Sequence, residues 1–153
     1  MTDEIRNKCM DNYIVLDLEW NQSSDGKEGT VEHFPFEIIE VGAVKLNGGL
    51  EEIDSFRRLV KPVVYPVINS KISEVTHMDA DELERDGGHF EDVVAEFLDW
   101  CGPEAVFCTW GSMDLTELQR NMAYYGIEIP FGKPLLYYDV QKLYSLLTGD
   151  GKA

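Results

Sequence analysis

Two acidic side chains, Asp17 and Glu19, interrupt the apolar segment 14–20, which reads IVLDLEW. Its length and β-branched residues predict a buried strand. Because side chains alternate across a strand, both carboxylates leave the same face. The other face is lined by Ile14, Leu16, Leu18 and Trp20. Adjacent buried anions are costly unless neutralised, and hard cations such as Mg²⁺ or Mn²⁺ bind carboxylate oxygens. The segment predicts a metal site, the alternative being an edge strand with a solvated outer face.

A third acid, Asp114, lies in the segment TWGSMD, directly after the apolar strand predicted at 105–109. Taken alone, Asp114 is a stabilising acid in the first turn of a helix. Together with Asp17 and Glu19 it places three carboxylates at one end of a sheet. That arrangement is typical of metal-assisted phosphoryl transfer.

The elements that position these acids follow from hydrophobic periodicity and turn residues. Strands are predicted at 14–20, 37–46, 52–61, 105–109 and 135–138, and helices at 69–75, 90–101, from the WGSMD segment to about Gly126, and after Asp139. The last helix is expected to bury Val140, Leu143, Tyr144 and Leu147. The order β-β-β-α-α-β-α-β-α predicts an α/β protein with a five-stranded mixed sheet flanked by helices. It matches a ribonuclease-H-like fold.

Length and composition limit the function classes. A chain of 153 residues predicts a single domain over 1–153. The net charge of −16, from 13 basic and 29 acidic residues, argues against tight, non-specific binding of duplex nucleic acid, but not against a small site that grips phosphate through metal ions. No apolar run predicts a membrane span, and Cys9, Cys101 and Cys108 are expected to be reduced thiols in a cytoplasmic protein.

The chain resembles the DEDD superfamily of 3′–5′ exonucleases, of the DnaQ-like DEDDh type and closest to the ERI-like RNA-processing branch. The resembling segments are IVLDLEW, FPFEIIEVGAVKL, DSFRRLVKP, ISEVTHMDADEL, FCTWGSMD and YYDVQKLY. The resemblance implies that Asp17, Glu19 and Asp114 are three of four catalytic metal ligands. It also implies two divalent ions, Mg²⁺ or Mn²⁺, with Asp17 bridging them, and the 3′ ends of single-stranded RNA or DNA as substrates.

The chain departs from the family at its last motif, HxxxxD or YxxxD, which carries the general base and the fourth acid. His33, His77 and His89 all precede Asp114, and neither later aspartate completes the motif. We therefore expect the family domain without its last catalytic helix, weakly active or inactive as this chain, with a homodimer over the uncovered face. The alternatives are an inactive nucleic-acid-binding or protein-interaction module that keeps the exonuclease fold, and acids that hold only a structural metal.

The resemblance also implies a set of positions near the terminal nucleotides: Leu18, Trp20, Thr76, His77, Met78 and Trp110. Met78 either wedges against a base or packs under its loop, and His77 either contacts a phosphate or is solvated. Strand alternation turns Trp20 away from the metal face and favours packing, and Trp110 is likewise expected to pack. Asp139 is expected to cap a helix. The basic residues Arg57, Arg58 and Lys61 are expected to form a solvated strand face.

Overall fold

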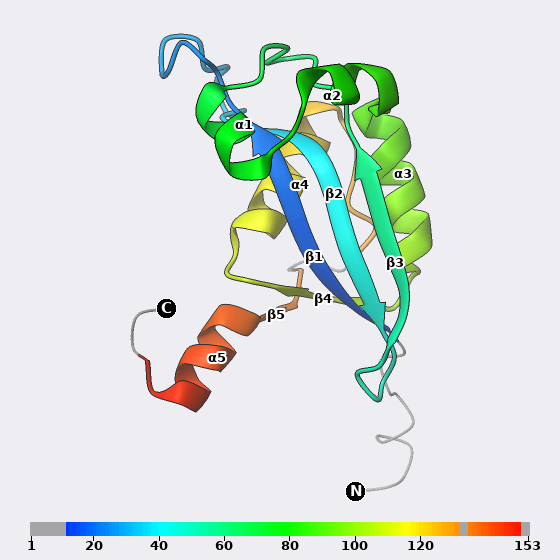
Figure 1. Cartoon of the computed structure of the whole chain (residues 1–153). Helices are drawn as coiled ribbons and strands as arrows, with labels where there is room; N and C mark the ends of the chain where they lie inside the picture. The colour runs from blue at the N-terminus through cyan, green and yellow to red at the C-terminus, as the bar shows by residue number, and fades with distance from the viewer. Residues whose placement is uncertain (1–11, 132–134, 151–153) are drawn as a thin grey trace, which may run out of the picture.

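The computed structural model describes residues 12–131 and 135–150, and within them the chain forms five strands and five helices (Figure 1). Along the chain these are β1 Asn12–Asn21, β2 Glu37–Leu46, β3 Glu52–Leu59, α1 Ser70–Thr76, α2 Ala80–Asp86, α3 Phe90–Cys101, β4 Ala105–Thr109, α4 Met113–Tyr124, β5 Tyr137–Asp139 and α5 Val140–Thr148. The predicted element order is confirmed, apart from one additional helix.

The additional helix is α2, which has no apolar periodicity in its sequence ADELERD. Asp79 begins it by accepting the Asp81 backbone N–H through its side chain, an ordinary N-cap. Only Leu83 of this helix is buried. A short polar helix of this kind is stabilised by its cap and one anchoring contact, so the hydrophobic pattern could not reveal it.

The strands form one mixed sheet in the order β3-β2-β1-β4-β5, with β1 antiparallel to β2, β2 antiparallel to β3, and β4 parallel to both β1 and β5. This confirms the predicted five-stranded mixed sheet. The bounds of the two outer strands differ from the prediction. Strand β3 ends at Leu59 instead of residue 61, and β5 is the short segment Tyr137–Asp139 instead of 135–138.

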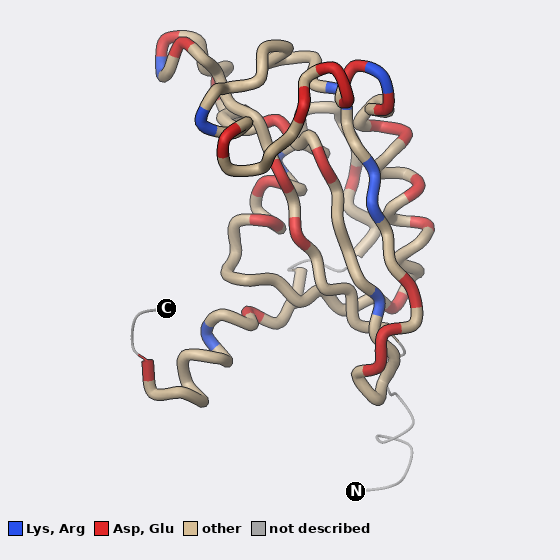
Figure 2. Tube along the Cα trace, in the orientation of Figure 1, with Lys and Arg blue, Asp and Glu red and all other residues tan. Residues whose placement is uncertain are grey.

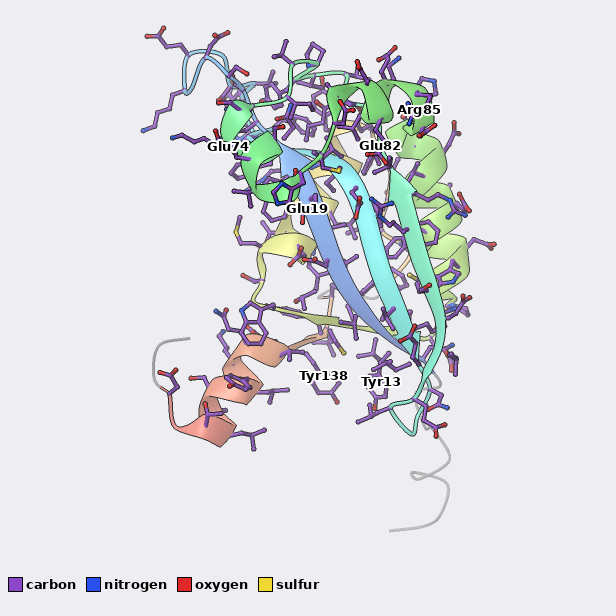
Figure 3. The ribbon with its side chains drawn as sticks, viewed as in Figure 1. Tyr13, Glu19, Glu74, Glu82, Arg85 and Tyr138 are labelled. Carbon is purple, nitrogen blue, oxygen red and sulfur yellow. The ribbon has the colours of Figure 1, made fainter. Side chains whose placement is uncertain are left out.

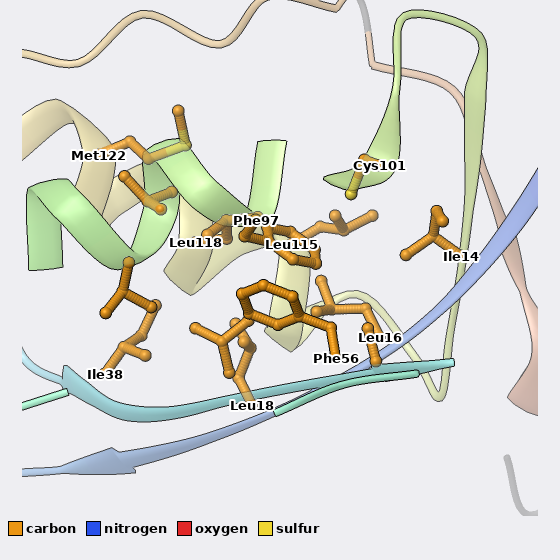
Figure 4. Packing of buried hydrophobic residues seen from close by; sticks show 14 of the residues in the cluster. Ile14, Leu16, Leu18, Ile38, Phe56, Phe97, Cys101, Leu115, Leu118 and Met122 are labelled. Carbon is orange, nitrogen blue, oxygen red and sulfur yellow. The ribbon is translucent and has the colours of Figure 1, made fainter. Parts of the chain in front are cut away.

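One face of the sheet is covered by α3 and α4, which enclose the main hydrophobic core (Figures 1 and 4). Strand alternation sends Ile14, Leu16 and Leu18 of β1 into this core. Phe97 of α3 and Leu118 of α4 pack against them from the helix layer. The predicted alternation of β1 is therefore confirmed, and the opposite face carries its acids.

That opposite face is covered only at one end within the described residues, by α1 and α2 (Figure 1). A small cluster of Ile39, Leu59, Met78 and Leu83 lies beneath these two helices. Farther along β1, Val15 and Asp17 are exposed on this face. We call this uncovered part of the sheet the open face.

The prediction that the last helix buries an apolar stripe is wrong. Asp139 does begin α5 by accepting the Lys142 N–H at 3.1 Å, as expected. The helix then leads away from the sheet (Figure 1), and its apolar residues are all exposed, up to 87% for Leu147. The reason is tertiary: β5 is a three-residue strand at the sheet edge, and among the described residues no helix or sheet face covers the apolar side of α5, which is touched by the Trp110 ring.

The thiols and the hydropathy of the helices add two observations. Cys101 and Cys108 are free and buried, and burial raises the pKa of the Cys101 thiol to about 12, while Cys9 lies outside the described residues. Among the described helices, none has both the length and the apolar character needed to cross a membrane.

Candidate active site

The site forms where β1 extends past its parallel neighbour. The pairing of β1 with β4 ends at Val15, opposite Cys108, so the backbone of β1 beyond that point has no β4 partner. Asp114 occupies the gap: its Oδ1 accepts the backbone N–H of Leu18 at 2.9 Å. Leu18 stands between Asp17 and Glu19 in the sequence. The structure thus brings the third acid beside the first two.

Helix α4 is fixed against the sheet near both of its ends. At its first turn the buried carboxylate of Asp114 holds β1. Near its last turn the buried amide of Asn121 accepts the Ile38 N–H at 3.0 Å and donates to the Phe36 carbonyl at 3.0 Å. Two attachment points on a helix define its axis, so Asp114 cannot shift without moving the helix.

The electrostatics of the acids reflect their proximity. Burial raises the pKa of the Glu19 carboxyl, and the neighbouring carboxylates of Asp17 and Glu40 raise it further, with a smaller contribution from Asp114. Burial also raises the pKa of the Asp114 carboxyl; the Leu18 N–H opposes that shift and Asp17 adds to it. No ion pair to Asp17, Glu19 or Asp114 occurs among the described residues.

A β-bulge brings a fourth carboxylate into the group. The register between β1 and β2 shifts between Glu19 and Trp20, which pair with Glu40 and Ile38. Ile39 is the extra residue, and it packs into the cluster beneath α1 and α2 while Glu40 comes to lie directly opposite Glu19. Bulges often redirect side chains beside active sites. Glu40 is neutralised by Arg57 of β3, whose Nη2 lies 2.7 Å from Glu40 Oε2.

The acids suit a hard divalent cation in their chemistry, because all are carboxylates and the partly buried Glu19 and the buried Asp114 are both repelled by Asp17. Their side chains are not arranged as a complete set of ligands: within 12–131 and 135–150, no three His, Cys, Asp or Glu side chains converge closely enough to hold a metal. Asp114 instead uses one oxygen for the Leu18 N–H. The shared ion therefore stays a prediction.

Two of the residues expected near the terminal nucleotides have side chains that do not reach the open face. Leu18 packs in the main core, because strand alternation turns it toward α3 and α4. Met78 is only 6% exposed and packs against Ile39, Leu59 and Leu83, so the packing alternative holds for it. Both side chains are thus packed in the interior, and contact of either position with a nucleotide stays a prediction.

Trp20 and Thr76 serve local structure. Trp20 packs against the main core and lies 5.7 Å from the Phe36 ring, as alternation predicted. The Thr76 hydroxyl donates to the Ile72 carbonyl at 2.8 Å and accepts the Met78 N–H at 3.2 Å, which ends α1.

His77 and Trp110 have accessible side chains. His77 ends α1 in a left-handed conformation with φ 55° and is exposed. Trp110 is 58% exposed, and its ring centroid lies 5.8 Å from that of Tyr144 in α5. Figure 3 shows Glu19 on the face that lies between α1 and α5.

Sequence reasoning missed a buried amide that joins β1 to α1. Asn21 donates to the carbonyls of Tyr65 at 2.8 Å and Val67 at 3.0 Å, and it accepts the Asn69 N–H at 2.9 Å. Asn69 in turn caps α1. A polar residue two positions beyond Glu19 on the same face of a strand was the available signal, because a buried amide needs partners.

Comparison with known proteins agrees with this geometry. The family model of the RNase T exonucleases, described as Exonuclease, matches residues 14–147. The PolC-type DNA polymerase III of Staphylococcus haemolyticus is 33% identical over 95 residues, which are 62% of this chain and 6% of that protein, and the S. aureus protein matches equally. The chain thus spans about 6% of the length of these curated relatives.

Solved structures share the fold. The nuclease domain of 3′hExo, a DEDDh family member bound to rAMP, superposes with a TM-score of 0.73 and 24% identity, covering 91% of this chain and 71% of that one. Cell-death related nuclease 4 (CRN-4) superposes with a TM-score of 0.74 and 17% identity, covering 94% of this chain and 49% of that one. Escherichia coli exonuclease I in complex with a dT13 oligonucleotide superposes with a TM-score of 0.67 and 13% identity, covering 92% of this chain and 31% of that one. With a family match over most of its length and this ribonuclease-H-like sheet, the chain belongs to the RNase T exonuclease family.

Proposed function

We propose that this chain is a metal-dependent 3′–5′ exonuclease domain that hydrolyses phosphodiester bonds at the 3′ ends of single-stranded RNA or DNA. The observation that carries the proposal is the hydrogen bond from the Leu18 N–H to Asp114 Oδ1. It joins the acid of α4 to the strand that carries Asp17 and Glu19, on a face open to a ligand. The family membership supports the same reaction class.

In this proposal Asp17, Glu19 and Asp114 would hold Mg²⁺ or Mn²⁺. Bound divalent ions supply an activated water and stabilise negative charge on the scissile phosphate. The protein's own contribution is placement: Leu18 orients Asp114 through its N–H, and the bulge in β2 keeps Glu40 beside Glu19. Burial raises the pKa of the Glu19 carboxyl and the neighbouring carboxylates add to that shift, so a bound cation would favour the ionised form of Glu19.

We propose low activity for this chain by itself. A positioned general base contributes about 10²–10⁴-fold to a hydrolysis. Among the described residues, no histidine forms a hydrogen bond or ion pair with Asp17, Glu19 or Asp114, and His77 lies exposed at the end of α1. This observation also favours the second candidate, an inactive nucleic-acid-binding or protein-interaction module that keeps the fold.

The test is a trimming assay with 5′-labelled single-stranded RNA and DNA of one sequence, in Mn²⁺ and in EDTA. The proposal expects slow, Mn²⁺-dependent removal of nucleotides from the 3′ end, lost in Asp17→Asn and kept in Asp99→Asn. Asp99 is an exposed acid on α3 and serves as the matched control. Metal-dependent binding of the oligonucleotide without any cleavage would favour the binding module, and the absence of both binding and cleavage would refute both candidates.

Neither the structure nor the relatives support the homodimer expected from the sequence. The 3′ ends of nucleic acids are the partners we propose for this chain, and the relative strengths of RNA and DNA as substrates are decided by the same assay.

A further inference from the structure

Arg57 stands on the open face in the same row as Asp17. In the sheet register Asp17 lies opposite Gly42 of β2, and Gly42 lies opposite Arg57 of β3. Figure 2 shows the basic residues of β3 across the sheet from the acids of β1. Two inter-strand spacings of about 4.8 Å place the two backbones roughly 10 Å apart, within the span of neighbouring groups on one extended ligand.

Nothing rises from β2 between these two side chains. Gly42 has no side chain, and a Cβ added there would lie 3.3 Å from the Asp17 carbonyl oxygen. The surface of the sheet between Asp17 and Arg57 therefore consists of backbone alone, and an extended nucleic-acid strand can cross it.

Arg57 is anchored and still has donors to offer. Glu40 holds its Nη2 at 2.7 Å, and the Arg57 side chain remains 63% exposed. A guanidinium has five N–H donors, so most of them stay available for a phosphate. Held at one edge, the side chain loses less conformational entropy when it binds.

The neighbouring Arg58 is also paired with a carboxylate and exposed, but it lies on the other face of the sheet. Arg58 points to the helix-covered face, where its Nη2 lies 2.5 Å from Glu96 of α3 and its guanidinium lies over the Phe56 ring. The two arginines are adjacent in sequence, on the same strand and both exposed. Arg58 is therefore a matched control.

We propose that Arg57 binds the phosphodiester next to the scissile one, so that the site prefers oligonucleotides with at least two phosphodiesters over dinucleotides. The inference rests on the proposed function, because Asp17 must mark the position of the scissile phosphate. A purely structural Arg57, serving only to neutralise Glu40 beside Glu19, would affect substrates of every length alike. Chain length therefore separates the two roles.

The experiment measures fluorescence anisotropy of 5′-fluorescein oligouridylates of two and five nucleotides in Ca²⁺, which occupies oxygen-ligand sites. Arg57→Ala is expected to weaken binding of the pentamer about tenfold, the loss of one charge-assisted contact, and to leave the dinucleotide unchanged. Arg57→Lys should retain part of the affinity. For the pentamer, the slope of log affinity against log salt should become shallower by about 0.7. Arg58→Ala should alter neither ligand.

Equal effects of Arg57→Ala and Arg58→Ala, or equal losses at both lengths, would overturn the inference while the proposed function stands. Thermal melting of each variant identifies a folding defect, and Arg57→Lys, which keeps the charge, tests the same contact if the alanine variant unfolds. Asp17→Asn should abolish the Ca²⁺-dependent part of binding at both lengths. Failure of the unaltered chain to bind either ligand would overturn the proposed function and this inference together.

Discussion

The buried amide of Asn21 offers a sharp test of how the open face is organised. Asn21 is fully buried, and its side chain satisfies three backbone groups of the segment that leads into α1: the carbonyls of Tyr65 and Val67 and the N–H of Asn69. Asn21→Leu keeps the number and branching of the side-chain heavy atoms, although the methyl groups are bulkier, and removes all three hydrogen bonds. It leaves two carbonyls and one N–H facing an apolar group.

The expected cost follows from the three lost bonds. A typical intramolecular hydrogen bond contributes about 0.5–1.5 kcal/mol net, and a buried group left unsatisfied costs about 1–3 kcal/mol. Water reaching part of the segment lowers the total, because residues 66 and 67 are exposed. We expect a loss of about 2–4 kcal/mol in the free energy of unfolding. With a urea m-value of about 2 kcal/mol/M, the midpoint should fall by roughly 1–2 M.

The assay is urea unfolding followed by tryptophan fluorescence, with Gln22→Leu as the control. Gln22 is the next residue, is partly exposed, and makes no side-chain hydrogen bond among the described residues. Its substitution should change stability by no more than about 0.5 kcal/mol. Hydrogen exchange of the Asn69 amide should accelerate in Asn21→Leu. A midpoint within 0.2 M of the unaltered chain (about 0.4 kcal/mol at that m-value) would show that this network does not hold α1.

Three further outcomes are expected. We expect weak Mn²⁺ binding by the unaltered chain in calorimetry, because hard divalent ions keep their waters where the protein supplies few ligands. Asp17→Asn should remove this binding, and tight binding that survives the substitution would place the metal elsewhere. Burial raises the pKa of Glu117, and the paired guanidinium of Arg120 opposes that shift. The contribution of Glu117 to stability is therefore present below its unfolded-state pKa and lost as pH rises through its folded-state pKa. Glu117→Gln should gain stability relative to the unaltered chain as pH rises above about 4, and a difference that does not change with pH would contradict the shift. Leu147→Lys on α5 should change stability by less than about 0.5 kcal/mol, whereas Leu118→Ala in the core should cost about 2–5 kcal/mol; comparable costs in thermal melts would mean that α5 is buried in solution.

The sequence determined the strands, because alternation and apolar runs are local signals. The pattern of residues 14–20 indicates which side chains enter the core and that Asp17 and Glu19 lie together on the opposite face of the strand. The structure agrees. The cap of α5 at Asp139 was predicted as well, since a capping side chain bonds within its own turn. The polar helix α2 was not, because its stability comes from a cap and one anchor.

Only the tertiary structure decided what meets across the sheet. The hydrogen bond between Asp114 and Leu18 depends on β4 pairing with β1 no farther than Val15, and that length is set by the packed sheet. The position of Glu40 depends on one bulged residue, which changes the face of every side chain beyond it. The burial of α5 was misjudged for the same reason: an amphipathic stripe shows that a helix has an apolar side, and only neighbouring elements determine whether anything covers it.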